Sequence, residues 1–69
     1  MITNGAIAVV NKIKEEHSAE TIEEMKVTLH DLTKFRKSRV ASVQILKGEF
    51  DITTKQAARV WHAYQLYLI

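Results

Sequence analysis

Four polar side chains recur at helical spacing in the middle of the chain, and their types suit recognition of nucleic-acid bases. On a helix over residues 29–37, the outward side chains would be His30, Thr33, Lys34 and Lys37. Imidazole and hydroxyl groups can donate or accept hydrogen bonds at base edges, and ammonium groups can reach guanine acceptors or phosphates. Three further cations better suit the phosphate backbone, where contacts set affinity and salt dependence rather than sequence choice. They are Arg36, Arg39 and Lys47.

Charge is unevenly divided along the chain. Residues 1–31 carry three lysines against six acidic residues, a net charge of −3, whereas residues 32–69 carry seven basic residues against two acidic ones, a net charge of +5. The overall charge of +2 says little about partners. The cations of the second half indicate an anionic partner there, or neutralisation of one half of the chain by the other.

Catalytic and metal chemistry find no support in the residue pattern. The chain has no glycine-rich phosphate loop, no serine or cysteine nucleophile motif and no spaced carboxylate pair. The three histidines, His17, His30 and His62, show no short ligand spacing, and cysteine is absent. We therefore expect a binding protein that is not an enzyme and uses no cofactor or metal.

The N-terminal residues predict neither a signal peptide nor a membrane span. No basic segment precedes the apolar residues 6–10, and Asn11 and Lys12 interrupt that stretch at once. We expect a cytoplasmic protein without membrane contact.

The elements that would position these side chains are helices. The 69 residues predict a single domain, and the absence of proline with only two glycines disfavours a fold of many short strands. Apolar residues at intervals of three and four predict an all-α fold, a small bundle of four to five short helices. We expect helices over about 5–17, from 19 to the mid-thirties, over about 40–47 and from 53 to the C-terminus.

Several residues predict where these helices begin and end. The first helix would be capped by Thr3 or Asn4 and the second by Ser18. Thr53 with Gln56 predicts a capping pair at the start of the last helix. Gly48 would end the helix before it.

The region from residue 19 to the mid-thirties can be one helix or two. Thr28 and Asp31 have capping-box spacing, as though a new helix began at Leu29, but no glycine or proline marks a turn at Lys26 to Thr28. With that turn, helices 19–26 and 29–37 form a helix-turn-helix. Its inward residues would be Ile22, Met25, Val27, Leu32 and Phe35.

Without the turn, residues 19–47 would form one or two long helices of a plain bundle. Arg36 and Arg39 would then pair with acidic residues of the N-terminal half.

In helix order and spacing, most of the chain resembles the small phage-type Cro and repressor proteins. These are five-helix domains of about this length, with the second and third helices forming the motif. The resemblance implies a small transcriptional regulator of phage or bacterial type that binds double-stranded DNA. Lys26 and Ile22 stand where that family usually has a glycine and a small residue.

A second register of the same motif is possible. The supporting helix would then span about 28–36 and the reading helix about 39–47, with Arg36 and Ser38 where the family prefers apolar side chains. The outward candidates of this register are Arg39, Ser42, Gln44 and Lys47.

The C-terminal segment 60–69 is apolar on nearly every side, more than one helix can bury on one core. This composition predicts a homodimer with an interface of Trp61, Tyr64, Tyr67 and Leu68, unless the first helix covers the surplus within a monomer.

A protein partner is the alternative to DNA. The modest net charge, the acidic first half and the apolar C-terminus also suit an inhibitor or adaptor that docks a helical face on a larger protein.

Overall fold

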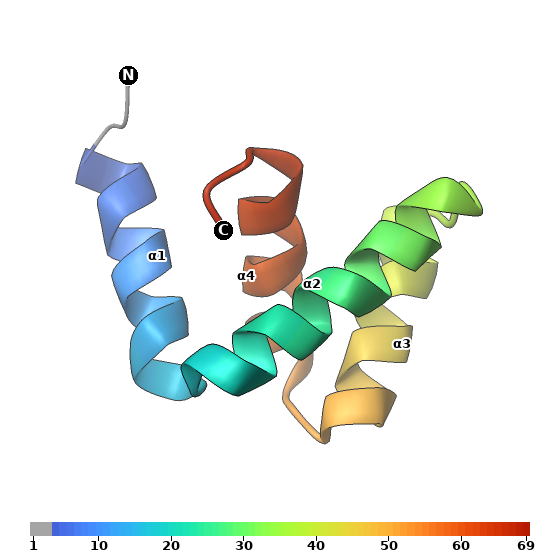
Figure 1. Cartoon of the computed structure of the whole chain (residues 1–69), viewed down its shortest axis with the longest axis horizontal. Coiled ribbons are helices and arrows are strands. Elements are labelled where there is room, and N and C mark those ends of the chain that lie inside the picture. Colours follow the sequence, from blue (N-terminus) through green and yellow to red (C-terminus); the bar gives the residue numbers. More distant parts are fainter. Residues whose placement is uncertain (1–3) are drawn as a thin grey trace.

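The computed structural model describes residues 4–69, which form four α-helices (Figure 1). The helices are α1 (Asn4–Glu16), α2 (Ala19–Lys34), α3 (Arg39–Phe50) and α4 (Thr54–Gln65). This part of the chain contains no strand, so the prediction of an all-α fold with four to five helices is confirmed. No helix among residues 4–69 has the length and apolar character needed to cross a membrane.

Side-chain caps begin three of the helices. The hydroxyl oxygen of Ser18 accepts a hydrogen bond from the Thr21 N–H at 3.1 Å, as predicted. At α4, Thr53 and Gln56 form the predicted capping box, in which each side chain accepts from the other residue's N–H at 3.0 Å. Ser38 caps α3. Thr3, one of the two predicted caps of α1, lies outside the described residues.

The predicted turn at Lys26 to Thr28 is wrong, because α2 runs through these residues without a break. A separate reading helix over 29–37 is therefore wrong as well. Met25 and Leu29 are both buried on one face of α2, so packing supports a continuous helix. The Thr28 hydroxyl, instead of capping a new helix, donates to Glu49 Oε1 of α3 at 3.2 Å.

The chain turns instead between α2 and α3, at residues 35–38. Arg36 adopts the left-handed conformation with φ 57°, and the Lys37 N–H donates to the Leu32 carbonyl oxygen at 2.9 Å. This bonding is that of a Schellman ending, in which the left-handed residue is most often glycine. α3 begins at Arg39, where the second register expected its reading helix to begin, but the supporting helix expected over about 28–36 is not a separate element, because α2 runs from Ala19 to Lys34.

The sequence predicted that α3 ends at Gly48. This is wrong, because α3 continues to Phe50. Phe50 packs against the core, which favours two more residues of helix. The reversal then falls on Asp51, with φ 52°. The Ile52 N–H donates to the Lys47 carbonyl oxygen at 3.2 Å.

The core draws on all four helices. In Figure 1, α1 and α3 lie on either side of α4, and α2 runs from the lower end of α1 across the front of α4 and α3. α3 packs most extensively on α4. The buried apolar residues are Ile13, Met25, Leu29, Val43, Leu46, Ala57, Val60 and Ala63.

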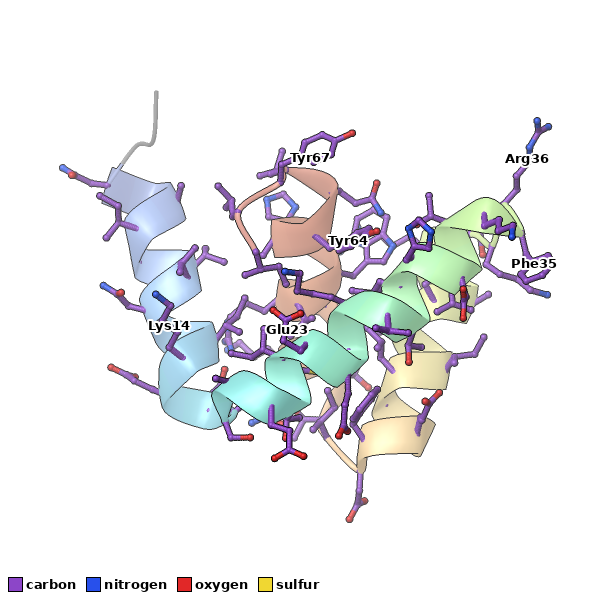
Figure 2. All side chains as sticks on the ribbon, in the orientation of Figure 1. Lys14, Glu23, Phe35, Arg36, Tyr64 and Tyr67 are labelled. Atoms are coloured by element: carbon purple, nitrogen blue, oxygen red, sulfur yellow. The ribbon has the colours of Figure 1, made fainter. Side chains whose placement is uncertain are left out.

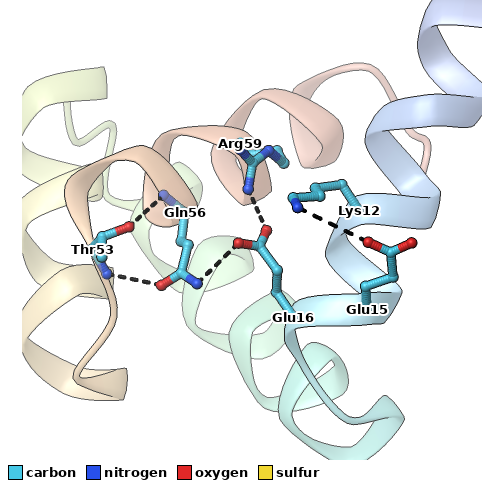
Figure 3. Close-up of polar contacts among 6 residues, drawn as sticks. All are labelled: Lys12, Glu15, Glu16, Thr53, Gln56 and Arg59. Carbon is cyan, nitrogen blue, oxygen red and sulfur yellow. Dashed lines mark hydrogen bonds and ion pairs between the residues drawn. The ribbon is translucent and has the colours of Figure 1, made fainter.

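A polar cluster joins the end of α1 to α4 (Figure 3). One carboxylate oxygen of Glu16 accepts from Gln56 Nε2 at 2.9 Å, and the other pairs with the Arg59 guanidinium. The side chains of Glu16 and Arg59 are only 16% and 19% exposed. The hydrogen bond from Gln56, followed by the bond and charge of Arg59, lowers the pKa of Glu16 against the opposing effect of burial. We call Glu16, Gln56 and Arg59 the α1–α4 junction.

Candidate nucleic-acid interface

Four cations gather where α2 gives way to α3. Lys34 is the last residue of α2, Arg36 and Lys37 lie in the turn, and Arg39 is the first residue of α3. All four are exposed, and Figure 2 shows Arg36 projecting away from the end of α2. We call these four residues the basic corner.

No cation of the basic corner forms an ion pair with another residue of the described range 4–69. The ion pairs in that range are Lys12–Glu15, Lys26–Glu23 and Arg59–Glu16. The alternative in which Arg36 and Arg39 pair with acidic residues of the N-terminal half is therefore wrong. Only Arg59, for which no pairing was predicted, forms such a contact within residues 4–69, with Glu16. The positive charge of the basic corner is not compensated by such contacts.

Arg39 is supported by an aromatic ring of α4. Its Cζ lies over the Trp61 ring, 5.6 Å from the ring centroid, within the range of a cation–π interaction. A guanidinium stacked in this way is restrained but keeps N–H donors for a second partner. Trp61 therefore connects the basic corner to α4.

The outward face of α3 carries both apolar and polar residues. Val40, Gln44 and Lys47 are exposed on it, and a Cβ added at Gly48 would have no atom within 4 Å. Another molecule can therefore approach the backbone of α3 closely at Gly48.

Three of the four outward candidates of the second register are exposed, namely Arg39, Gln44 and Lys47. Ser42 is 2% exposed, so its outward placement is wrong. It lies one turn before Leu46 on the inner face of the helix.

The remaining predicted DNA-binding residues lie outside the basic corner. His30 and Thr33 are exposed on α2, where they share one side with Lys34. Lys47 lies in the last turn of α3, at the far end of that helix from the basic corner. The structure thus brings four of the seven predicted residues together at one corner and leaves three along the adjoining helices.

Sequence reasoning missed the exposure of Val40 and Gly48. The helix predicted over about 40–47 was expected to bury Val40 with Val43 and Leu46, and this is wrong, because Val40 is 71% exposed. Val43, Leu46 and Phe50 recur at intervals of three and four and mark the inner face of α3. The same periodicity places Gly48 outside, but it gives no signal for Val40, which precedes Val43 by three residues.

The predicted dimer-interface residues are covered unequally. Trp61, Tyr64 and Leu68 pack in part against the chain's own core. Tyr67 is 94% exposed and projects from the end of α4 in Figure 2. Among the four, Tyr67 offers most of its surface to another molecule.

No group of three or more His, Asp or Glu side chains within residues 4–69 is placed to hold a metal ion. The chain matches no protein-family model, and comparisons with curated proteins and with solved structures give no significant match. The resemblance to Cro and repressor proteins stays a prediction.

Proposed function

We propose that the protein binds double-stranded DNA through the basic corner and the outward face of α3, as a small transcriptional regulator of phage or bacterial type. The observation that carries the proposal is the basic corner, with four exposed cations that make no ion pair within residues 4–69. These cations immediately precede a helix whose outward face is accessible. Unpaired cations beside an accessible helix suit the phosphate backbone next to a major groove.

In this proposal α3 enters the major groove and α2 supports it. The Gln44 amide can bond adenine, Lys47 can reach guanine acceptors, and the Val40 methyl groups can contact the thymine methyl. Because Gly48 has no side chain, it leaves room for the wall of the DNA major groove.

The other cations and polar groups hold the DNA backbone. Lys34, Arg36, Lys37 and Arg39 contact phosphates, which sets affinity and orientation. His30 and Thr33 face the flanking backbone from α2.

A regulator of this kind binds as a homodimer, since paired half-sites call for a symmetric contact between subunits. Tyr67, with neighbouring surface of Trp61, Tyr64 and Leu68, is the proposed contact. The protein acts in the cytoplasm, without catalysis or cofactor.

Titration with a fluorescently labelled duplex of mixed sequence at two salt concentrations tests the proposal. We expect the protein to bind the duplex, and the logarithm of its binding constant to fall linearly with the logarithm of the salt concentration. The slope should be about −0.9 for each phosphate contact. Lys37→Ala should reduce that slope, whereas Lys12→Ala, a cation on α1, should leave it unchanged. The absence of binding at low salt would overturn the proposal.

A protein partner is the second candidate, and two exposed apolar side chains favour it. Phe35 and Val40 are each 71% exposed. Phe35 lies between cations of the basic corner, and Val40 directly follows its last residue, Arg39. A partner that covers these side chains would bury apolar surface beside a charged rim.

Affinity capture from a nuclease-treated lysate separates the two candidates. One stoichiometric protein partner, lost with Phe35→Ser but kept in a Lys34→Ala, Lys37→Ala chain, would favour the second candidate. Capture that disappears with nuclease would favour DNA.

A further inference from the structure

A groove lies between α1, α2 and the C-terminal residues, at the other end of α2 from the basic corner. Its volume is about 410 Å³, within the range of roughly 300–1,000 Å³ that is common for small-molecule sites. Its apolar lining comes from Val10, Ile22, Leu68 and Ile69, all of which are half-buried. These side chains suit an aliphatic chain.

The groove also has a positively charged opening. Lys14 on α1 and Lys26 on α2 both line it, together with Glu23. Lys26 is bonded to Glu23 at 3.2 Å, whereas Lys14 makes no ion pair with any residue from 4 to 69. Figure 2 shows Lys14 and Glu23 on the two helices that border the groove. Lys14 therefore remains available to an anionic group.

A fourth polar residue of the groove, His17, has a buried side-chain nitrogen without a hydrogen-bond partner. The Nε2 atom of His17 is buried and has no hydrogen-bond partner, and no other buried side-chain nitrogen or oxygen within residues 4–69 shares that condition. His17 lines the same groove. A buried nitrogen without a partner costs folding free energy, which a bound ligand can recover.

We propose that this groove binds a medium-chain aliphatic carboxylate, such as a free fatty acid. The alkyl chain lies against Val10, Ile22 and Leu68. The carboxylate pairs with Lys14. The side chains that cover His17 Nε2 move aside on binding, and this nitrogen, in the tautomer that carries its proton, donates a hydrogen bond to the carboxylate. The proposal does not depend on DNA binding.

Calorimetric titration of the whole chain with octanoate, below the concentration at which it forms micelles, tests the site. Octan-1-ol has the same chain without the charge, and acetate has the charge without the chain. We expect saturable octanoate binding, affinity for the alcohol lower by about three- to tenfold, and no binding of acetate. Equal affinity for octanoate and octan-1-ol would overturn the proposal.

Two variants test whether Lys14 and His17 bind the carboxylate. Lys12→Gln, on the same helix as Lys14, is the matched control. Lys14→Gln should weaken octanoate binding by about three- to tenfold, and Lys12→Gln should leave it unchanged. His17→Phe keeps an aromatic ring in place but removes Nε2. It should lose affinity by a similar factor while its melting temperature stays the same or rises, because a desolvated nitrogen is gone.

Unchanged octanoate affinity in both Lys14→Gln and His17→Phe would overturn the proposal. A lower melting temperature of His17→Phe would show that the imidazole of His17 contributes to folding, and would overturn the inference that it is left for a ligand. Affinity that falls as protein concentration rises would show that a second copy occupies the groove, and this result too would overturn the proposal.

Discussion

At the α1–α4 junction, Glu16 and Arg59 are mostly covered and are bonded to each other, whereas Arg36 and Lys37 in the basic corner are exposed and make no ion pair within residues 4–69. The junction joins helices at opposite ends of the chain, so its charges contribute to the fold. The basic corner brings like charges together, which opposes folding slightly. The charges of the junction are paired within the fold. The charges of the basic corner have no such pair and are available to a partner.

The two regions differ in backbone conformation as well. Glu16 and Arg59 lie in helices, whereas Arg36 adopts a left-handed conformation that costs a residue with a Cβ about 1–2 kcal/mol. Stability and DNA binding should therefore respond to different substitutions. The predictions below test that separation.

The largest effect is expected from neutralising three cations of the basic corner together. Arg36→Ala, Lys37→Ala and Arg39→Ala in one chain should weaken duplex DNA binding by about 100-fold at low salt, if each lost contact contributes about 1 kcal/mol. The free energy of unfolding should change by less than about 1 kcal/mol, because the side chains are exposed and only Arg39 loses a contact, its stacking on Trp61. Fluorescence anisotropy and urea unfolding measure the two quantities. A large loss of stability would remove the distinction between the regions.

The opposite result is expected at the α1–α4 junction. Glu16→Ala should lower the free energy of unfolding by about 1–3 kcal/mol, because it leaves Arg59 and Gln56 partly buried without their acceptor. DNA affinity should stay unchanged while the chain is folded. Glu15→Ala is the matched control, since its contact with Lys12 is exposed and 4.0 Å long, and it should cost less than about 0.5 kcal/mol.

The pH dependence of stability sharpens the comparison. The pKa of Glu16 lies below its ordinary value of 4.5 in the folded chain, so the contribution of its carboxylate is fully present above that value. It is lost as pH falls through the lower folded-state pKa. Urea unfolding from pH 7 to pH 3 should therefore show the stability of the natural chain approaching that of Glu16→Gln at the acidic end. A constant difference between the two chains would contradict this.

The smallest effect is expected at Arg36. Arg36→Gly should raise the free energy of unfolding by about 0.5–1 kcal/mol, because glycine adopts the left-handed conformation without strain. It should weaken DNA binding severalfold by removing one cation. Arg36→Ala is the control, since it removes the charge but keeps the Cβ. Equal stability of the glycine and alanine variants would contradict the prediction that the left-handed conformation of Arg36 is strained.

Much of the fold could be predicted because its signals are local. The caps at Ser18 and Thr53 and the apolar spacing of Met25 and Leu29 are all visible in the sequence. The predicted turn at Lys26 to Thr28 failed because Thr28 and Asp31 imitate a cap, while burial of residues on both sides favours an unbroken helix. The real turn has no glycine, so Arg36 gave no signal of a reversal.

Part of the candidate site could also be predicted. The cations from Lys34 to Arg39 are close in sequence and therefore remain close in space. The stacking of Arg39 on Trp61 could not be found, since 22 positions separate them and only the packing of α3 on α4 brings them together. The groove around His17 depends in the same way on Leu68 and Ile69, which are distant in sequence from α1 and α2.

Trp61 is the only tryptophan of the chain, and it lies beneath a cation of the basic corner. Indole emission responds to charge and solvent near the ring. A molecule that draws the guanidinium of Arg39 away from the ring will therefore change the intensity or wavelength of the emitted light. The natural, unlabelled chain thus contains its own optical reporter for whatever occupies that corner.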